Sequence, residues 1–500
     1  MGSANRCRDD AKGCHLVLLD PLRFAPAADG EETKVATGRF EPGVADWAYL
    51  PVGVPAGVRE LAVRYRHDRP APAPGVAGNA LDIGIFDQRG HQLGDAAGFR
   101  GWSGGSRDSF VISRSQATPG YLPGPVDPGS WHVVLGPYTV APQGMNWTVE
   151  VTLRFGAPGP AAVPDPAPPR AGGRGRSWYR GDLHLHTVHS DGQRTPEELV
   201  AGARAAGLDF IVSTEHNTSS ASLIWGRHAG PDLLIVDGEE VTTRNGHYLA
   251  IGLPPGAWVD WRYRAVDGAI DRFLREIHAK GGLAVAAHPH CPSLGCSWRF
   301  GEVGIDGIEV WNGPWTADDE VAVKDWDRML VEHARAGRWI PAVANSDAHR
   351  EPQVIGLPHN VVLASDLERR AVLRGLRLGR LWMAESAAVQ LALTAAAAGR
   401  SAGIGGRLRV RPDEPVSVRL EVRGAPGHLV RLLTDLGQVL ETRLPDSAPG
   451  TVDWTTTPQR SAYVRAEVRR PEPTPTTPDT MVALTNPVFL GPVISGRPPA

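Results

Sequence analysis

The alternation of apolar and polar positions predicts an all-β segment over the first 155 residues. In the run 147–155, every second residue is apolar, with Thr, Glu and Arg between them. A period of two is typical of a strand that buries one face. Shorter apolar runs at 61–65, 81–86 and 131–135 are separated by turns rich in Gly and Pro. We therefore expect an N-terminal β-sandwich-like domain over residues 1–155.

The pattern changes twice more along the chain. Residues 156–177 are almost entirely Pro, Gly, Ala and Arg, which predicts a semi-extended linker. Strand-like alternation returns near the end, at 416–423 and 462–468. We therefore expect a central domain over 178–386 and a C-terminal all-β, sandwich-like domain over 387–500.

Within 178–386, short apolar runs alternate with amphipathic helical segments. One helix opens at Thr195, where Thr195 and Glu198 form a capping box, and Gly207 stops it. The sequence predicts further helices over 270–280 and 318–335, and strands over 182–187, 208–214, 234–236, 283–287, 307–311 and 340–344. Repeated β-α units of this kind predict a mainly parallel sheet or barrel that binds ligands at the carboxyl ends of its strands.

Composition narrows the possible partners. The 52 Lys and Arg nearly balance the 55 Asp and Glu, for a net charge of −3, so no nucleic-acid partner is expected. No apolar stretch approaches the roughly 18 residues of a membrane segment. No secretory leader is evident, so we expect the chain as written to remain in the cytoplasm. If the true start lies upstream, a leader there would direct secretion. The cysteines form two close pairs, Cys7/Cys14 and Cys291/Cys296, without C-x-x-C spacing, and free thiols are favoured over disulfides.

Polar side chains follow one predicted strand after another in the central domain. His184 and His186 lie two residues apart on one strand face, with Cβ atoms roughly 6–7 Å apart, close enough to share an ion. The later strand ends carry His216, Glu239, Glu240, His247, His288, His290, Asp347 and His349, and Asp191 follows the first pair in its loop. Such a mixed nitrogen and oxygen set suits Zn²⁺, Mn²⁺ or Fe rather than Ca²⁺.

The ordered motifs DLHLHTxxSDG, TEHN, GEE…GH, AHPH and NSDAH resemble those of the PHP (polymerase and histidinol phosphatase) superfamily of metallohydrolases. Within it, FRGWSGGSRDSF and TPGYLPGP in the N-terminal segment are similar to the CehA/McbA branch, which includes a carbamate hydrolase. The resemblance implies a distorted (β/α)7 barrel over 178–386 with two or three divalent metals at its mouth. The sequence differs from the family pattern at two positions. Glu215 stands where Asp is usual, and Asp191 stands where some members have His.

The resemblance also implies a ligand set. The first metal would be held by His184, His186, Glu240 and Asp347. Glu240, rather than its neighbour Glu239, would bridge to a second metal on His247 and His288. A third site would consist of Asp191, His216 and His349.

From this set we expect a metal-dependent hydrolase in which a metal-bridged hydroxide cleaves an ester of a small molecule. Glu240, Asp347 and His288 are the expected catalytic residues, and the expected substrate contacts are His290, Asn217, Asn312 and Arg350. The ester is either a phosphoester or an aryl carboxyl or carbamate ester. Trp298, Trp311 and Trp315 either line an aryl-binding wall or pack in the core. The alternative is a polymer- or surface-binding protein with a degenerate site.

Overall fold

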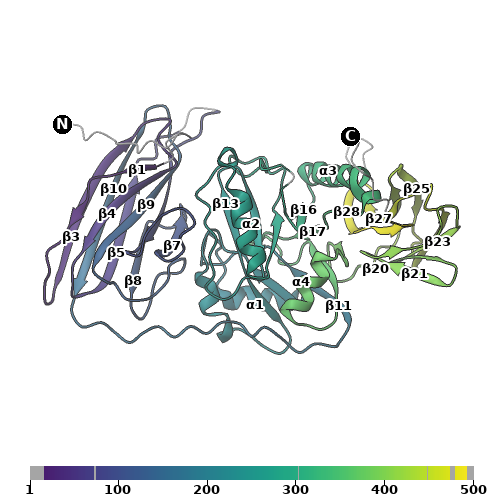
Figure 1. Ribbon diagram of the computed structural model, residues 1–500, viewed down its shortest axis with the longest axis horizontal. Helices are drawn as coiled ribbons and strands as arrows, with labels where there is room; N and C mark the ends of the chain where they lie inside the picture. Colours follow the sequence, from purple (N-terminus) through teal and green to yellow (C-terminus); the bar gives the residue numbers. More distant parts are fainter. Residues whose placement is uncertain (1–15, 72–74, 302, 448, 473–478, 493–500) are drawn as a thin grey trace.

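The computed structural model describes residues 16–71, 75–301, 303–447, 449–472 and 479–492. Along the long axis, Figure 1 shows the N-terminal strands, a central part that carries the helices, and the C-terminal strands. The described chain is mostly β, with four α-helices.

The N-terminal strands form two sheets around a common core. The run 147–155 is a strand as predicted, and its alternate residues Trp147, Val149 and Val151 are buried in that core. One sheet has the order β1-β4-β9-β6-β7, with β2 beside β4, and the other has the order β3-β10-β5-β8. Their bounds are Leu16–Leu18 (β1), Leu22–Arg23 (β2), Glu31–Phe40 (β3), Trp47–Val54 (β4), Val58–His67 (β5), Ala80–Phe86 (β6), Phe99–Gly104 (β7), Ser109–Ser113 (β8), Gly129–Thr139 (β9) and Met145–Phe155 (β10). We call this pair of sheets the sandwich.

Seven central strands follow one another in the order β17-β16-β15-β14-β13-β12-β11. They are Ser177–Asp182 (β11), Phe210–Ser213 (β12), Leu234–Thr243 (β13), Gly246–Ile251 (β14), Leu283–Ala286 (β15), Gly307–Asn312 (β16) and Ala342–Asn345 (β17). The α-helices are Pro196–Ala205 (α1), Ile270–Ala279 (α2), Ala317–His333 (α3) and Arg369–Arg377 (α4). The predicted capping box of Thr195 and Glu198 is present at α1.

This arrangement does not show the expected (β/α)7 barrel. The strand β14 pairs antiparallel with both β13 and β15. A tight turn at Arg244 and Asn245 joins β13 to β14, which leaves no room for a crossover helix between them.

The side chain of Asn360 connects the two ends of this row of strands. The amide of Asn360 accepts from the backbone N of Ala344 (3.0 Å) and donates to its carbonyl (2.7 Å). Asn360 lies in β18 (His359–Ala364), which pairs with β11, whereas Ala344 lies in β17. Beyond the strands, an isolated bridge joins Leu185 to Ala348. The row thus curls so that the carboxyl ends of β11 and β17 meet.

The C-terminal strands continue the central sheet, because β19 (Leu381–Ala384) pairs with β28 (Thr480–Thr485). The remaining strands are Gln390–Ala397 (β20), Arg400–Gly403 (β21), Arg407–Leu408 (β22), Val416–Arg423 (β23), Leu429–Thr434 (β24), Gly437–Arg443 (β25), Gly450–Thr456 (β26), Tyr463–Arg470 (β27) and Val488–Leu490 (β29). The alternation at 462–468 suggests one exposed face, yet Arg465 and Glu467 are buried. Arg465 pairs with Glu467 at 2.7 Å and with Asp327 of α3 at 2.8 Å, so the charges are buried as partners.

Aromatic rings hold the sandwich against the central part. Trp47 and Trp102 of the sandwich lie 5.8 and 4.5 Å from Trp261, centroid to centroid, and Phe99 stacks on Trp258 at 4.1 Å. The connecting segment, which has no strand between 156 and 176, follows the surface of the central part (Figure 1). The sandwich therefore has a fixed face toward the strand ends of the central sheet.

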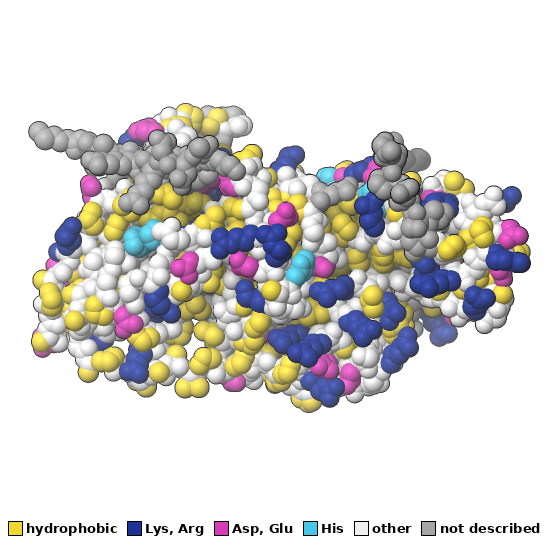
Figure 2. Space-filling view, in the orientation of Figure 1, with side chains coloured by type: hydrophobic (Ala, Val, Ile, Leu, Met, Phe, Trp, Pro, Cys, Tyr) yellow, Lys and Arg dark blue, Asp and Glu magenta, His cyan; other side chains and the backbone are white. Residues whose placement is uncertain are grey.

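No helix among the described residues is long and apolar enough to span a membrane. On the face drawn in Figure 2, basic side chains are more numerous over α4 and the C-terminal strands than over the sandwich. Acidic side chains lie among them, so this face has no continuous surface of one charge.

We predict that Asn360→Leu weakens the closure between β17 and β18. The substitution leaves the buried N–H and C=O of Ala344 unpaired, at a cost of about 2–4 kcal/mol. Hydrogen exchange should show the Ala344 amide opening at a correspondingly lower free energy, whereas the exposed control Gln438→Leu should leave it unchanged. Equal protection in both variants would contradict this role.

Candidate metal centre

His184 and His186 lie directly after β11 and not within it. The predicted strand over 182–187 is misplaced, since β11 spans Ser177–Asp182 and shares only Asp182 with it. The buried carboxylate of Asp182 accepts hydrogen bonds from the backbone N of Ser346 (3.2 Å) and of Gly356 (3.0 Å). These bonds tie the end of β11 to the loop after β17, and the chain leaves the ladder there.

Side chains replace the missing ladder partners beyond Asp182. The backbone N–H groups of every second residue donate to neighbouring side chains: Leu183 to Asn345 (2.9 Å), Leu185 to Thr214 (2.9 Å) and Thr187 to Glu215 (3.1 Å). The carboxylate of Glu215 also accepts hydrogen bonds from the hydroxyls of Thr187 and Ser190, at 2.5 Å each. It therefore holds the loop that carries Asp191. Burial raises the pKa of Glu215 to about 7.

Four side-chain atoms converge beyond these strand ends: His184 Nε2, His186 Nε2, Glu240 Oε2 and Asp347 Oδ1. His184 Nε2 lies 3.2 Å from Glu240 Oε2 and 3.3 Å from Asp347 Oδ1. His186 Nε2 lies 3.4 and 3.0 Å from the same two oxygens. All four atoms are buried, and none forms a hydrogen bond among the described residues. They face one another as ion pairs, and Glu240 Oε2 also lies 2.9 Å from His216 Nδ1.

These atoms fit a divalent cation. Ligands held 2.0–2.1 Å from a tetrahedral ion are separated from one another by about 3.3 Å. The four imidazole–carboxylate separations, 3.0 to 3.4 Å, match that spacing. Buried polar atoms normally form hydrogen bonds, so four that form none at a single point indicate a ligand cage.

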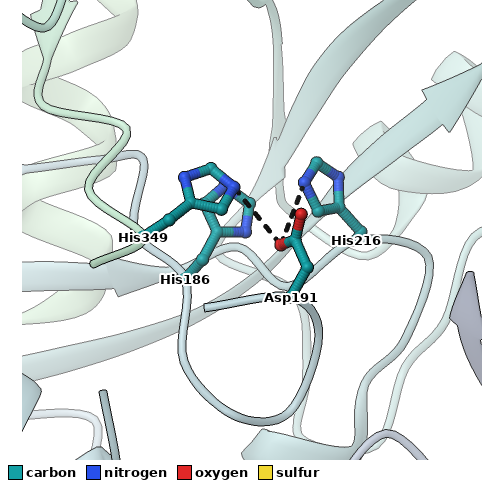
Figure 3. A group of neighbouring side chains, drawn as sticks. All are labelled: His186, Asp191, His216 and His349. Carbon is teal, nitrogen blue, oxygen red and sulfur yellow. Dashed lines mark ion pairs between the residues drawn. The ribbon is translucent and has the colours of Figure 1, made fainter. Parts of the chain in front are cut away.

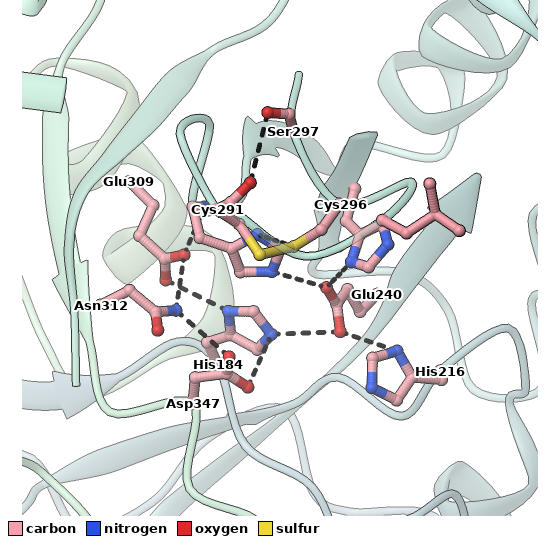
Figure 4. Close-up of a disulfide and its surroundings, with 12 residues drawn as sticks. His184, His216, Glu240, Cys291, Cys296, Ser297, Glu309, Asn312 and Asp347 are labelled. Carbon is pink, nitrogen blue, oxygen red and sulfur yellow. Dashed lines mark hydrogen bonds and ion pairs between the residues drawn. A yellow bond between two sulfur atoms is a disulfide. The ribbon is translucent and has the colours of Figure 1, made fainter. Parts of the chain in front are cut away.

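The second oxygen of Glu240 faces another pair of imidazoles (Figure 4). Glu240 Oε1 lies 2.9 Å from His247 Nδ1 and 3.1 Å from His288 Nε2. The adjacent Glu239 points elsewhere, accepting from the backbone N of Val259 at 2.9 Å. Of the two glutamates, only Glu240 is placed to bridge two ions.

A third group lies around Asp191, as Figure 3 shows. Asp191 Oδ1 is 3.2 Å from His349 Nε2 and 3.5 Å from His216 Nε2. With His186, the ligand atoms of these residues lie within 4.8 Å of one another. The structure thus brings together all nine of the predicted ligands.

The carboxylates and imidazoles of the cluster stabilise one another's charges. Burial alone raises the pKa of Glu240, but His216 and His184 outweigh it and hold that pKa well below its usual range. For His216, burial lowers the pKa, yet Glu240 and Asp191 raise it to about 10. Metal binding to such a set requires the imidazoles to be neutral and so displaces protons.

The sequence analysis missed Glu309, a buried residue of β16. Its Oε1 lies 3.1 Å from His184 Nδ1 and accepts from Asn345 Nδ2 at 2.7 Å. Its Oε2 accepts from the backbone N of His288 at 2.8 Å. Glu309 therefore orients two of the predicted ligands. A single acidic residue inside the apolar run 307–311 was the available signal.

The backbone is strained at this centre. Among the described non-glycine residues, Asn217, His288 and Asp347 have positive φ angles of 53°, 25° and 49°, and the remaining case is Ala398. Such conformations cost about 1–3 kcal/mol each and cluster at functional sites. Here they aim His288 and Asp347 into the cluster.

The predicted substrate contacts have different environments. His290 pairs with Asp325 of α3 at 2.8 Å. Asn312 Nδ2 donates to Glu309 Oε2 (3.0 Å) and Asp347 Oδ2 (3.3 Å), so it positions ligands. Arg350 lines a separate cavity of about 640 Å³. Asn217 lines the cleft beside the cluster.

Cys291 and Cys296 form a disulfide, so the free-thiol interpretation is wrong for this pair (Figure 4). Cys296 Sγ lies 3.3 Å from His288 Nδ1. The disulfide closes the loop that follows β15 and lies against one of the predicted ligands. Cys7 and Cys14 lie outside the described residues.

A cleft of about 470 Å³ opens beside the cluster, between the sandwich and the central part. The sandwich contributes Trp47, Asp82, Trp102 and Tyr138, and the central part contributes Asp191, His216, Asn217, Thr242, Arg244 and Trp261. None of Trp298, Trp311 and Trp315 lines it. The aromatic residues of the cleft thus come largely from the sandwich, and not from the three tryptophans that the sequence suggested.

No protein-family model matches the chain. An uncharacterized protein of Methanocaldococcus jannaschii is 26% identical over 154 residues, which are 27% of this chain and 81% of that protein.

Several solved structures resemble the chain, among them the following two. One is a two-domain protein from Bacteroides vulgatus containing a predicted PHP-like metal-dependent phosphoesterase (16% identity, 66% of this chain, all of that chain, TM-score 0.34). The other is an amidohydrolase from Chromobacterium violaceum with bound sulfate and no metal (19%, 35% and 89%, TM-score 0.26). Both TM-scores are below 0.5, so neither likeness assigns a function to this chain.

We predict that Glu309→Gln weakens divalent-metal binding by about 10- to 100-fold, because the charge that orients His184 is lost. Competition with a chromophoric chelator measures the affinity. Glu197→Gln, on the exposed side of α1, is the matched control and should bind metal like the unmodified protein. Unchanged affinity in Glu309→Gln would show that Glu309 does not support the cage.

Proposed function

We propose that this protein is a metal-dependent hydrolase that cleaves an ester bond of a small molecule at the cluster around Glu240. The observation that carries the proposal is the convergence of four buried ligand atoms that form no hydrogen bond among the described residues, with imidazole–carboxylate separations of 3.0 to 3.4 Å. Without an ion, only the ion pairs between these imidazoles and carboxylates would offset the burial of the four atoms. A degenerate site in a binding protein would have no reason to keep this arrangement.

Some residues would hold the divalent ions, and others position those ligands. Divalent ions would lower the pKa of a water molecule and polarise the ester. His184, His186, Asp347 and Glu240 would hold one ion, and Glu240 would share another with His247 and His288. Glu309 and Asn312 hold the ligands His184 and Asp347 in place.

The cleft supports an aromatic substrate. Four aromatic residues line the cleft next to His216 and Asp191: Trp47, Trp102, Tyr138 and Trp261. Aryl esters, whether of phosphate, carboxylic acid or carbamic acid, would place the ring against this wall and the scissile group near the cluster. We propose this aryl ester class as the substrate.

We predict that metal-reconstituted protein cleaves at least one of four p-nitrophenyl esters: phosphate, phosphodiester, acetate or N-methylcarbamate. A chelator should abolish cleavage, and His184→Ala and Asp347→Ala should reduce it to the rate without enzyme, because each removes a ligand of the cage.

The matched control is His228→Ala, which lies outside the cluster and should retain activity. Metal-independent cleavage, or full activity in both cage variants, would refute the proposal. Metal binding without cleavage of any ester would instead favour the binding role.

A further inference from the structure

One cationic side chain in the cleft has an unpaired edge. Arg244 lies in the turn between β13 and β14 and lines the cleft together with Asp191 and His216. Its Nε and Nη2 atoms are buried and have no hydrogen-bond partner among the described residues. The N–H groups on these two atoms point from the same side of the planar guanidinium.

The sandwich fixes the orientation of this guanidinium. Its central carbon lies 4.2 Å from the ring centroid of Tyr138 and 5.1 Å from that of Trp47. Stacking on two rings holds the plane of the group, with the Nε and Nη2 edge left over for hydrogen bonding. Arg244 is thus preorganised by residues far from it in the sequence.

Two parallel N–H donors match two oxygens of one carboxylate or phosphate. Burying the donors unpaired costs free energy, and an oxyanion in the cleft would recover it. Asp82 and Asp191 are the carboxylates that line the same cleft, and Asp82 is under the electrostatic influence of Arg244. Burial raises the pKa of Asp82 to about 6, against the opposing effect of Arg244.

We propose that Arg244 binds an oxyanion of the substrate through Nε and Nη2, so that the hydrolase prefers aromatic esters that carry a negative charge. This inference rests on the proposed function and specifies its substrate class. The oxyanion is either the scissile phosphate itself or a carboxylate elsewhere on the aromatic substrate, and two substrates distinguish these sources.

The kinetic test compares three substrates of the metal-loaded full chain: 4-nitrophenyl phosphate, 4-acetoxybenzoate and neutral phenyl acetate. Arg244→Gln should lower kcat/KM for one or both anionic esters by about 10- to 100-fold more than for phenyl acetate, the range expected for hydrogen bonds to a charged group. Arg244→Lys should recover part of the loss.

Asp82→Asn should raise the preference for anionic esters, since it removes a competing negative charge. Arg272→Gln is the matched control, because Arg272 also packs on an aromatic ring and contacts the sandwich, but does not line the cleft. A selective loss on the phosphate or on the benzoate identifies the source of the oxyanion.

A binding measurement separates this inference from the hydrolase proposal. Calorimetry of the metal-free protein with benzoate and with inorganic phosphate should show binding of at least one anion that Arg244→Gln weakens about tenfold or more. If no ester is cleaved but this binding is observed, the hydrolase proposal fails and the oxyanion site stands. Equal losses on charged and neutral esters, or anion binding unchanged in Arg244→Gln, would overturn the inference.

Discussion

The carboxylate of Glu240 is the group on which the centre depends, because its two oxygens face two different sets of imidazoles. One oxygen belongs to the cage with His184 and His186, and the other faces His247 and His288. A buried carboxylate is costly unless it is paired, and here its partners are themselves candidate ligands. The strained backbone at His288 and Asp347 is tolerated because this arrangement over-determines their positions.

A layer of hydrogen-bonding residues keeps these ligands in place. Glu309 contacts His184 and the backbone of His288, and Asp182 joins the end of β11 to the loop that carries Asp347. Asn360 closes the same region by pairing with the backbone of β17. The site is therefore held by rigid strand ends on several sides, as precise ligand geometry requires.

The sandwich contributes directly to the cleft and is more than an attached domain. Trp47 and Trp102 pack on Trp261 of the central part, and the same rings line the space next to Asp191 and His216. The metal ligands and the surface that would recognise a substrate thus come from different segments of the chain. Chemistry and specificity can consequently change independently in such an arrangement.

The sequence by itself determined the strands with clear alternation, the capped helix α1 and the set of polar residues at the strand ends. These are local features, since a period of two, a capping box and a strand-end motif can each be read within a few residues. It did not determine the antiparallel strand β14 within the central row, the burial of Arg465, the disulfide beside His288 or the role of Glu309. The disulfide, the role of Glu309 and the burial of Arg465 depend on partners that are 5, 125 and 138 residues away in the sequence. The cleft was decided by the tertiary structure alone, because the packing of Trp47 and Tyr138 around Arg244 and of Trp102 on Trp261 brings the sandwich to the predicted metal ligands.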